Sequence, residues 1–130
     1  MFSHIMLGAN DLDASKEFYD AILGKLGAKP GVLSPNLHGH KRYFYFLDGS
    51  IFIITEPINH EPATHGNGST IGFKARSAED ADAWHAAGIA NGGKAIEDPP
   101  GIREGNGMKL YLAYLLDPTG NKICAMHTIR

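Results

Sequence analysis

The most specific local signal in this chain is the segment LLDPTGNKICAMH, residues 115–127. Its centre, DPTG at 117–120, has the residues of a tight turn, because proline presets φ at the second position and glycine accepts a positive φ near the end. The apolar run Tyr111–Leu116 enters this turn, and Lys122–His127 leaves it. The sequence therefore predicts a hairpin that closes the C-terminal end of a sheet.

Length and composition indicate one compact domain over residues 1–130. The chain has 43% hydrophobic and 20% charged residues, a net charge of −2 and one cysteine. This balance gives no electrostatic reason to expect a nucleic-acid partner. No apolar run approaches the ~20 residues of a membrane-spanning helix, no secretory signal is visible, and a single cysteine fits a reducing compartment. We therefore expect a cytoplasmic protein with no membrane or nucleic-acid partner.

The first half of the chain predicts a strand, a helix and three further extended segments. A strand is expected at Phe2–Gly8, and Asn10-Asp11 is a candidate cap for a helix over Leu12–Leu26, where apolar residues recur every four positions. Gly27 ends that helix. Residues 36–41 are expected to form a polar loop. The extended segments are predicted at Lys29–Pro35, Arg42–Leu47 and Ile51–Thr55, the last two joined by a hairpin turn at residues 48–50.

The second half repeats this order after a linker at residues 57–68. A strand is expected at Thr70–Ala75, and Ser77 begins a helix that carries Ala81, Trp84 and Gly88 on one stripe. Residues 94–97 are extended, residues 98–107 form a loop rich in proline and glycine, and the closing hairpin follows. We infer an internal duplication, with module one at residues 1–56 and module two at residues 69–130.

Overlaying the two halves pairs four strand positions. If the helix stops Gly27 and Gly93 are superposed, an offset of 66 residues places His4 on Thr70. If the hairpin glycines Gly49 and Gly120 are superposed instead, Ile53 falls on Cys124.

Three motifs give the chain a family resemblance. They are FSHIML at 2–7 followed by Asp11-Leu12, PATHGNG at 62–68, and DPTGNKI at 117–123. With these motifs the whole chain resembles the glyoxalase / bleomycin resistance / extradiol dioxygenase (vicinal oxygen chelate) superfamily. The resemblance implies an α+β fold in which two βαβββ modules form an eight-stranded, cup-shaped mixed sheet with helices outside. It also implies a homodimer, because the modules of this family often pair between chains.

The resemblance further implies a divalent metal held by the strand positions that correspond to His4, Ile53, Thr70 and Cys124. Family members usually have histidine and glutamate there, whereas this chain keeps one imidazole. Cys124 could bind a soft ion as thiolate, but isoleucine cannot bind and a threonine hydroxyl is a poor donor. Because a metal needs at least three converging ligands, we expect His4 to be a remnant of an incomplete site. Glu56 is the nearest carboxylate, and it would point to the opposite face unless the strand bulges.

Strand alternation predicts which side chains face the cup. If His4 faces it, Met6 does too, while Ile5 and Leu7 face the helices. Arg42 follows two histidines and could meet a substrate carboxylate or phosphate through paired hydrogen bonds, or its segment could be a solvated loop. The predicted pocket residues are His4, Met6, Arg42, Phe46, Ile53, Thr70, Tyr114 and Cys124. The alternative for His4, for Cys124 and for the aromatic residues of this set is a purely structural role.

Two functions remain open from the sequence. The first is a family member without the complete metal site that binds a small, partly apolar molecule in the cup, as a sequestering protein or as an enzyme of unknown chemistry. The second is a metal-dependent lyase similar to glyoxalase I, or a related metal-dependent enzyme such as a dioxygenase. The residues at the four family positions favour the first, because function depends on the site and not on the fold.

Overall fold

The computed structural model describes residues 1–35 and 39–130 and contains two modules of similar order. Module one consists of β1 (Ile5–Gly8), α1 (Leu12–Gly24), β2 (Val32–Pro35), β3 (Lys41–Leu47) and β4 (Ser50–Thr55). Module two consists of β5 (Ile71–Lys74), α2 (Ala78–Ala90), β6 (Lys94–Ala95), β7 (Gly101–Gly105), β8 (Met108–Leu116) and β9 (Lys122–Thr128).

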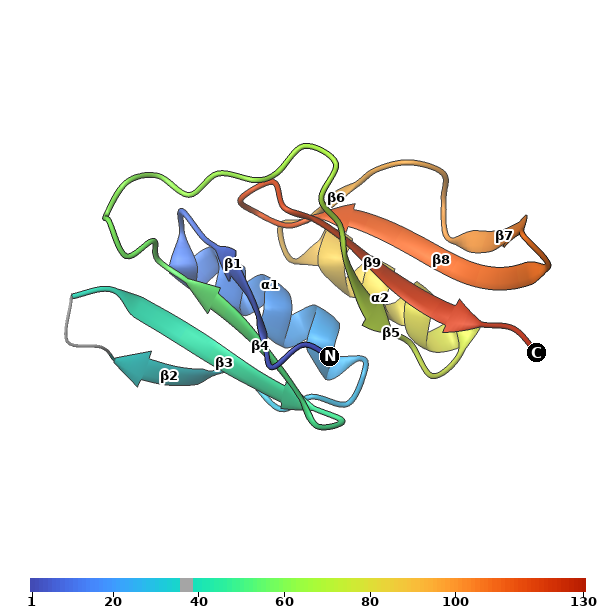
Figure 1. Ribbon diagram of the computed structural model, residues 1–130, viewed down its shortest axis with the longest axis horizontal. Coiled ribbons are helices and arrows are strands. Elements are labelled where there is room, and N and C mark those ends of the chain that lie inside the picture. Colours follow the sequence, from blue (N-terminus) through green and yellow to red (C-terminus); the bar gives the residue numbers. More distant parts are fainter. Residues whose placement is uncertain (36–38) are drawn as a thin grey trace.

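Each module has its own mixed sheet, and the two sheets lie side by side with both helices behind them (Figure 1). The strand order is β1-β4-β3-β2 in one sheet and β5-β9-β8-β6 in the other, where β7 also pairs with β8. The first strand of each module is parallel to the last, and the remaining pairs are antiparallel. The predicted α+β cup of two modules is therefore confirmed, although the described residues form nine strands in two mixed sheets and not eight, because module two has one strand more than module one.

Local sequence explains where the helices begin and where the first one ends. The Asp11 carboxylate accepts a hydrogen bond from the Ala14 amide at 3.0 Å, and the Ser77 hydroxyl accepts one from the Asp80 amide at 3.0 Å. Both therefore satisfy an amide that the first helical turn leaves without a partner. Gly27, with φ of 103°, takes the left-handed conformation that follows α1.

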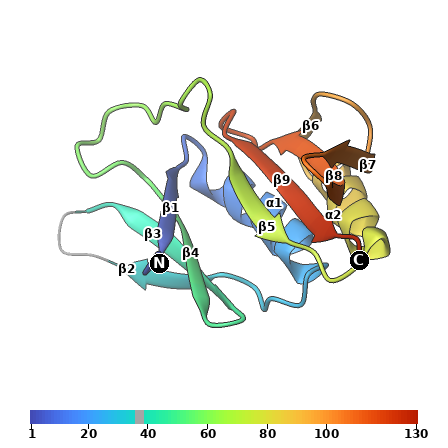
Figure 2. The ribbon, with the colours of Figure 1, turned by 45° about the vertical axis from the view of Figure 1, so that its right-hand side comes forward.

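The core lies between the helices and the backs of the two sheets. Helices α1 and α2 contact each other, as Figure 2 shows from the side. Strand residues alternate as predicted, because Ile5 and Leu7 pack on this core. The helix side chains Phe18, Ile22 and Trp84 are fully buried in it. The opposite faces of the strands are thus free to form the cup.

The segment 115–127 forms the expected hairpin and also joins the two modules. Oδ1 of the buried Asp117 accepts hydrogen bonds from three backbone amides of the turn, those of residues 119, 120 and 121, each at 2.9 Å. Its Oδ2 accepts one from the Tyr19 hydroxyl of α1 at 2.7 Å. The side chain of Asn121 donates to the Gly8 carbonyl of β1 at 3.0 Å. The turn motif therefore has a structural role.

The predicted loop at residues 98–107 is wrong, because it contains strand β7. Asn106 and Gly107 both have positive φ, 51° and 74°, and form a two-residue turn between β7 and β8. Asn-Gly is typical of such hairpins, so the signal was present. The expected strand at Phe2–Gly8 begins only at Ile5. The expected loop at residues 36–41 ends before Lys41, which belongs to β3, and residues 36–38 of it lie outside the described part of the chain.

Candidate functional site

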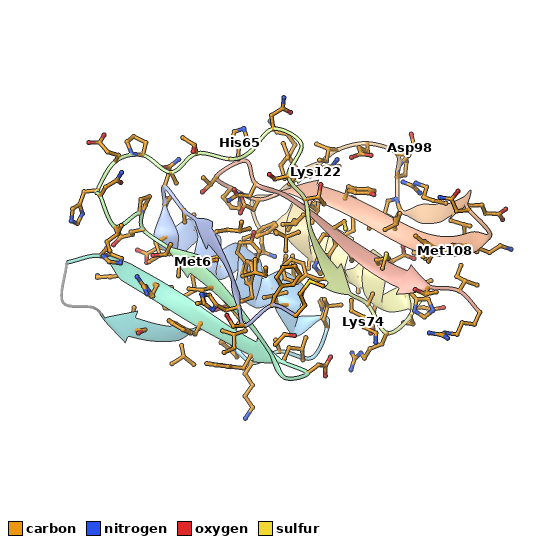
Figure 3. All side chains as sticks on the ribbon, in the orientation of Figure 1. Met6, His65, Lys74, Asp98, Met108 and Lys122 are labelled. Carbon is orange, nitrogen blue, oxygen red and sulfur yellow. The ribbon has the colours of Figure 1, made fainter. Side chains whose placement is uncertain are left out.

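The cup face is the surface of the two sheets turned away from the helices. Each module contributes to this face a row of three residues that lie side by side on neighbouring strands. In module one, Met6 and Phe44 both lie opposite Ile53. In module two, Gly72 and Tyr114 both lie opposite Cys124. Met6 of β1 and Lys74 of β5 lie in different sheets, one on each side of the boundary between the modules (Figure 3).

The four positions that the family resemblance pairs with metal ligands, His4, Ile53, Thr70 and Cys124, provide few donors. His4 is exposed, and its Nδ1 lies 2.8 Å from the Ser3 hydroxyl. Thr70 is exposed at the start of β5, whereas Ile53 is only 3% exposed. Among the described residues, no three side chains of histidine, cysteine, aspartate or glutamate gather as a metal site requires. The donor set of one imidazole, one thiol and one hydroxyl does not fit the usual metal of the family.

Cys124 is a buried thiol at the centre of module two. It is 8% exposed, and a Cβ built on Gly72 would lie 3.2 Å from its sulfur. Burial raises the pKa of the Cys124 thiol, although nearby Lys122 opposes this shift. The neutral thiol is therefore favoured, which makes Cys124 a weak nucleophile and a weak metal ligand in this environment.

Glu56 does not replace the missing glutamate. Its Oε1 accepts a hydrogen bond from the Lys41 amide at 2.8 Å, while its own amide donates to the Lys41 carbonyl. Both contacts hold Glu56 at the end of the β3–β4 ladder. These contacts account for the position of Glu56 without the strand bulge that would have turned its carboxylate toward the cup.

A cavity of about 470 Å³ lies between the modules, at the end of β1 where the chain begins. His4 lines it from module one, and Gly72 and Lys74 line it from module two. Its walls are mostly apolar and include Ile51, Phe52 and Phe73. Asp48 and Lys74 add charge of both signs. This cavity can hold a small molecule with an apolar body and a few polar atoms.

A second cavity, of about 450 Å³, lies over β5 and β9 in module two. Cys124 and Met126 line it, together with cations such as Lys74. The eight predicted pocket residues are therefore not brought together in one cavity. His4 lines the first and Cys124 the second, whereas the other six line neither of these two: Met6, Arg42, Phe46, Ile53, Thr70 and Tyr114.

Five of those six lie on the cup face outside the cavities, Met6 and Ile53 in the row already described and three others beside it. Arg42 and Phe46 are on β3, and Tyr114 is on β8. The Lys122 ammonium lies 5.1 Å from the centre of the Tyr114 ring and also pairs with Glu97. Burial, with the nearby Cys124 and Glu97, raises the pKa of the Tyr114 hydroxyl. Tyr114 is therefore a neutral aromatic contact at physiological pH.

The sequence analysis missed Lys74 and Phe73 as cavity residues. Both residues line both cavities, because they lie on β5, the strand that separates the two cavities. The alternation that places Thr70 and Gly72 on the cup face extends to Lys74 two residues later, so this cation could have been found. Phe73 packs against the core, where it contacts Phe52, and the cavity extends to it there, which no local pattern indicates.

Comparison with known proteins agrees with this architecture. The family model described as Glyoxalase/Bleomycin resistance protein/Dioxygenase superfamily matches residues 1–125. Among curated proteins there is no match. A glyoxalase/bleomycin resistance protein from Albidiferax ferrireducens T118 has a crystal structure that is similar over 98% of both chains, with 63% sequence identity and a TM-score of 0.90.

More distant structures share the fold alone. A glyoxalase/bleomycin resistance protein/dioxygenase family enzyme from Burkholderia phytofirmans PsJN is 18% identical over 98% of both chains, with a TM-score of 0.70. The fosfomycin resistance protein FosX from Listeria monocytogenes is 18% identical, with a TM-score of 0.68, over 100% of this chain and 92% of that one. On the match to residues 1–125 and the 63% identity, the chain belongs to the glyoxalase/bleomycin resistance protein/dioxygenase superfamily.

Proposed function

We propose that this protein binds a small, partly apolar molecule between its two modules, without the complete metal site that is usual in its family. The cavity there is lined by His4 and Gly72 on the side of the cup, and on the side of the core by Leu23 of α1 and by Leu26, which follows that helix. The observation that carries the proposal is the cavity of about 470 Å³ between the modules. This volume lies within the range of small-molecule sites, and such sites combine apolar walls with a few polar groups. Module one contributes polar groups from His4, Asp48 and Ser50, and His4 is the one that the family resemblance associates with a metal.

The donor set supports a role that does not depend on a family metal. Ile53 takes a ligand position with a side chain that cannot coordinate, and Cys124 is held as a neutral thiol by burial. A lyase similar to glyoxalase I needs a Lewis acid at this point. The likeness to FosX at 18% identity supports the fold and adds no residue to the site.

We also propose that the protein is a cytoplasmic homodimer. β1 has one hydrogen-bonded neighbour and so does β5, which leaves an open edge on each sheet. Open edges in folded proteins are commonly covered, and a second copy of the chain can cover them. No helix among the described residues is both long and apolar enough to cross a bilayer.

Metal content tests the first half of the proposal. The untagged protein is dialysed with Zn²⁺, Ni²⁺, Co²⁺, Fe²⁺ or Mn²⁺, and bound metal is measured by inductively coupled plasma mass spectrometry. We expect no near-stoichiometric metal. Stoichiometric metal that disappears in His4→Ala or Cys124→Ala would contradict the proposal and bring the metal-dependent lyase forward.

Binding of a neutral apolar probe tests the second half. The fluorescent amine N-phenyl-1-naphthylamine is titrated into the wild type, into His4→Ala, and into His65→Ala, which removes an exposed imidazole outside both cavities. We expect the affinity to fall about threefold or more in His4→Ala, because a polar contact and a wall of the cavity are lost. His65→Ala should bind like the wild type. Equal affinity of all three proteins would show that His4 is not part of the site.

A further inference from the structure

Arg42 lies on the cup face at the opposite end of β3 from the cavity between the modules. It pairs with Thr55 at the end of β4, whereas the cavity is lined by Leu47 and Ile51 at the other end of the hairpin. Phe46 lies four positions after Arg42, roughly 13 Å along the strand at the usual rise. Any function of Arg42 is therefore separate from the cavity that contains His4.

The guanidinium of Arg42 is held in place by His40. Nη2 of Arg42 lies 2.6 Å from Nε2 of His40. Because arginine can only donate, Nε2 of the imidazole accepts this hydrogen bond. His40 is 2% exposed, so its ring is fixed by the surrounding structure. The orientation of the guanidinium is therefore set before any ligand arrives, which lowers the entropy that binding must lose.

The charge of Arg42 has no carboxylate partner among the described residues. The ion pairs of this part of the chain do not include it, and the nearby Glu56 carboxylate accepts from the Lys41 amide instead. Residues 36–38 are Asn-Leu-His and carry no carboxylate. Nε of Arg42 is buried and has no hydrogen-bond acceptor in the described structure. Because Nε is closed to solvent, a ligand can bind the guanidinium only through Nη1 and the N–H of Nη2 that does not face His40.

Two phenylalanines share the cup face of β3 with Arg42. Phe44 and Phe46 follow Arg42 on the same face of β3, and their rings stack with centroids 6.2 Å apart and planes 22° apart. Phe46 is 56% exposed. Ile53 lies opposite Phe44, with Met6 on its other side. The cup face of module one therefore has a cation at one end and an apolar surface leading away from it.

We propose that Arg42, Phe44 and Phe46 form a recognition site for an organic anion. The carboxylate, phosphate or phosphonate oxygens of the ligand bind the guanidinium, and its aromatic or aliphatic body lies on the two phenylalanine rings. Arginine suits such groups because its planar fork donates two parallel hydrogen bonds. His40 is a positioning residue that acts through Arg42. The site is independent of the cavity proposed above, and a ligand can bind here whether or not that cavity is used.

Calorimetric titration with phenylphosphonate, phenylacetate and inorganic phosphate tests this site. Arg42→Gln removes the charge and keeps most of the stem, and Lys41→Gln removes an equal charge from the neighbouring, exposed residue on the other face of β3. We expect saturable binding of at least one aryl anion to the wild type. Affinity should fall about tenfold or more in Arg42→Gln and stay within about twofold in Lys41→Gln. The preference between phenylphosphonate and phenylacetate identifies the acid group.

Two further variants separate the parts of the site. Phe44→Ala should weaken the aryl anions and leave inorganic phosphate unchanged, because Phe44 is the ring nearer to Arg42 on β3 and phosphate has no body to lie on it. Arg42→Lys keeps the charge but loses the fork, and it should bind about threefold or more weakly than the wild type.

Several results would overturn the proposal. These are no saturable binding of any probe to the wild type, equal affinity of Arg42→Gln and the wild type, or equal losses in Arg42→Gln and Lys41→Gln. Binding of N-phenyl-1-naphthylamine to Arg42→Gln is measured in parallel, because retained binding shows that the variant is folded and keeps the two proposals apart. If Arg42→Gln does not fold, Arg42→Lys decides the question, and wild-type affinity in that variant also overturns the proposal.

Discussion

The surroundings of Cys124 favour the protonated thiol. Cys124 is almost fully buried, its neighbour on β5 is Gly72, and its neighbour on β8 is Tyr114. A thiolate here would lose most of its hydration, which burial in an apolar environment makes costly. The residue therefore packs as a small apolar side chain, the role that lone cysteines often have in folded proteins.

This environment predicts a pH dependence of stability. Because burial raises the thiol pKa in the folded state, the unfolded chain releases the proton first as the pH rises. The stabilisation from Cys124 is thus fully present below the ordinary thiol pKa of about 8.5 and is lost as the pH rises through the folded value. The free energy of unfolding of the wild type, minus that of Cys124→Ala, should fall between about pH 8 and pH 10 in urea titrations. A difference that stays constant or grows with pH would contradict this assignment.

At the scale of elements, the sequence predicted most of the fold through periodicity and caps. The two helices, the hairpins and the alternation of the cup strands follow from patterns within a few residues, such as the stripe of Ala81, Trp84 and Gly88. Strand β7 was missed because its composition is rich in glycine and charge, so that only the Asn106-Gly107 turn marked it.

The candidate site was less predictable, because its contacts join residues far apart in the sequence. Strand alternation placed Met6, Ile53 and Cys124 on one face, but it could not show that the open cavities lie to either side of β5. Nor could it show that His40 is buried against Arg42. Such features depend on how whole sheets are placed, and the spacing of residues in one strand does not determine that.

The contact between the helices predicts opposite effects for two glycines. Gly88 on α2 has no room for a side chain, because an added Cβ would overlap Leu115 Cδ1 and lie 3.3 Å from both Ile22 and Phe18. Gly24 at the end of α1 has nothing within 4 Å of the same position. Gly88→Ala should lower the free energy of unfolding by about 1–3 kcal/mol through overpacking. Gly24→Ala should raise it by up to about 1 kcal/mol through helix propensity.

Urea denaturation of both variants checks this prediction. If Gly88→Ala is as stable as Gly24→Ala, the close approach of α2 to β8 and α1 is not a constraint on the fold. The comparison is matched, since both changes add one methyl group to a helical glycine.

At the scale of the molecule, the two modules are joined by more than helix packing. The Tyr19 hydroxyl of module one donates to the Asp117 carboxylate of module two, and Asn121 of module two donates to the Gly8 carbonyl of module one. The linker adds a third connection, because Asn10 binds both the amide and the carbonyl of Ala63, at 2.7 and 3.3 Å. All three lie near the same end of the sheets (Figure 1).

These connections predict that the modules unfold as one cooperative unit. Asp117→Ala removes the acceptor for Tyr19 and for three turn amides, and it should lower the free energy of unfolding by about 2–4 kcal/mol. Native-state hydrogen exchange then measures the two modules separately, through the amides of Ile54 on β4 and Ile123 on β9. We expect protection of both amides to fall by the same free energy, because each module needs the other to cover its core. Tyr111→Phe is the control, since it removes a hydroxyl that donates to Asp82 within module two, and it should change neither amide by more than about 0.5 kcal/mol. Loss of protection at Ile123 with full protection at Ile54 would show that module one is stable without module two. The two modules would then be separate folding units, and the prediction of one cooperative unit would be wrong.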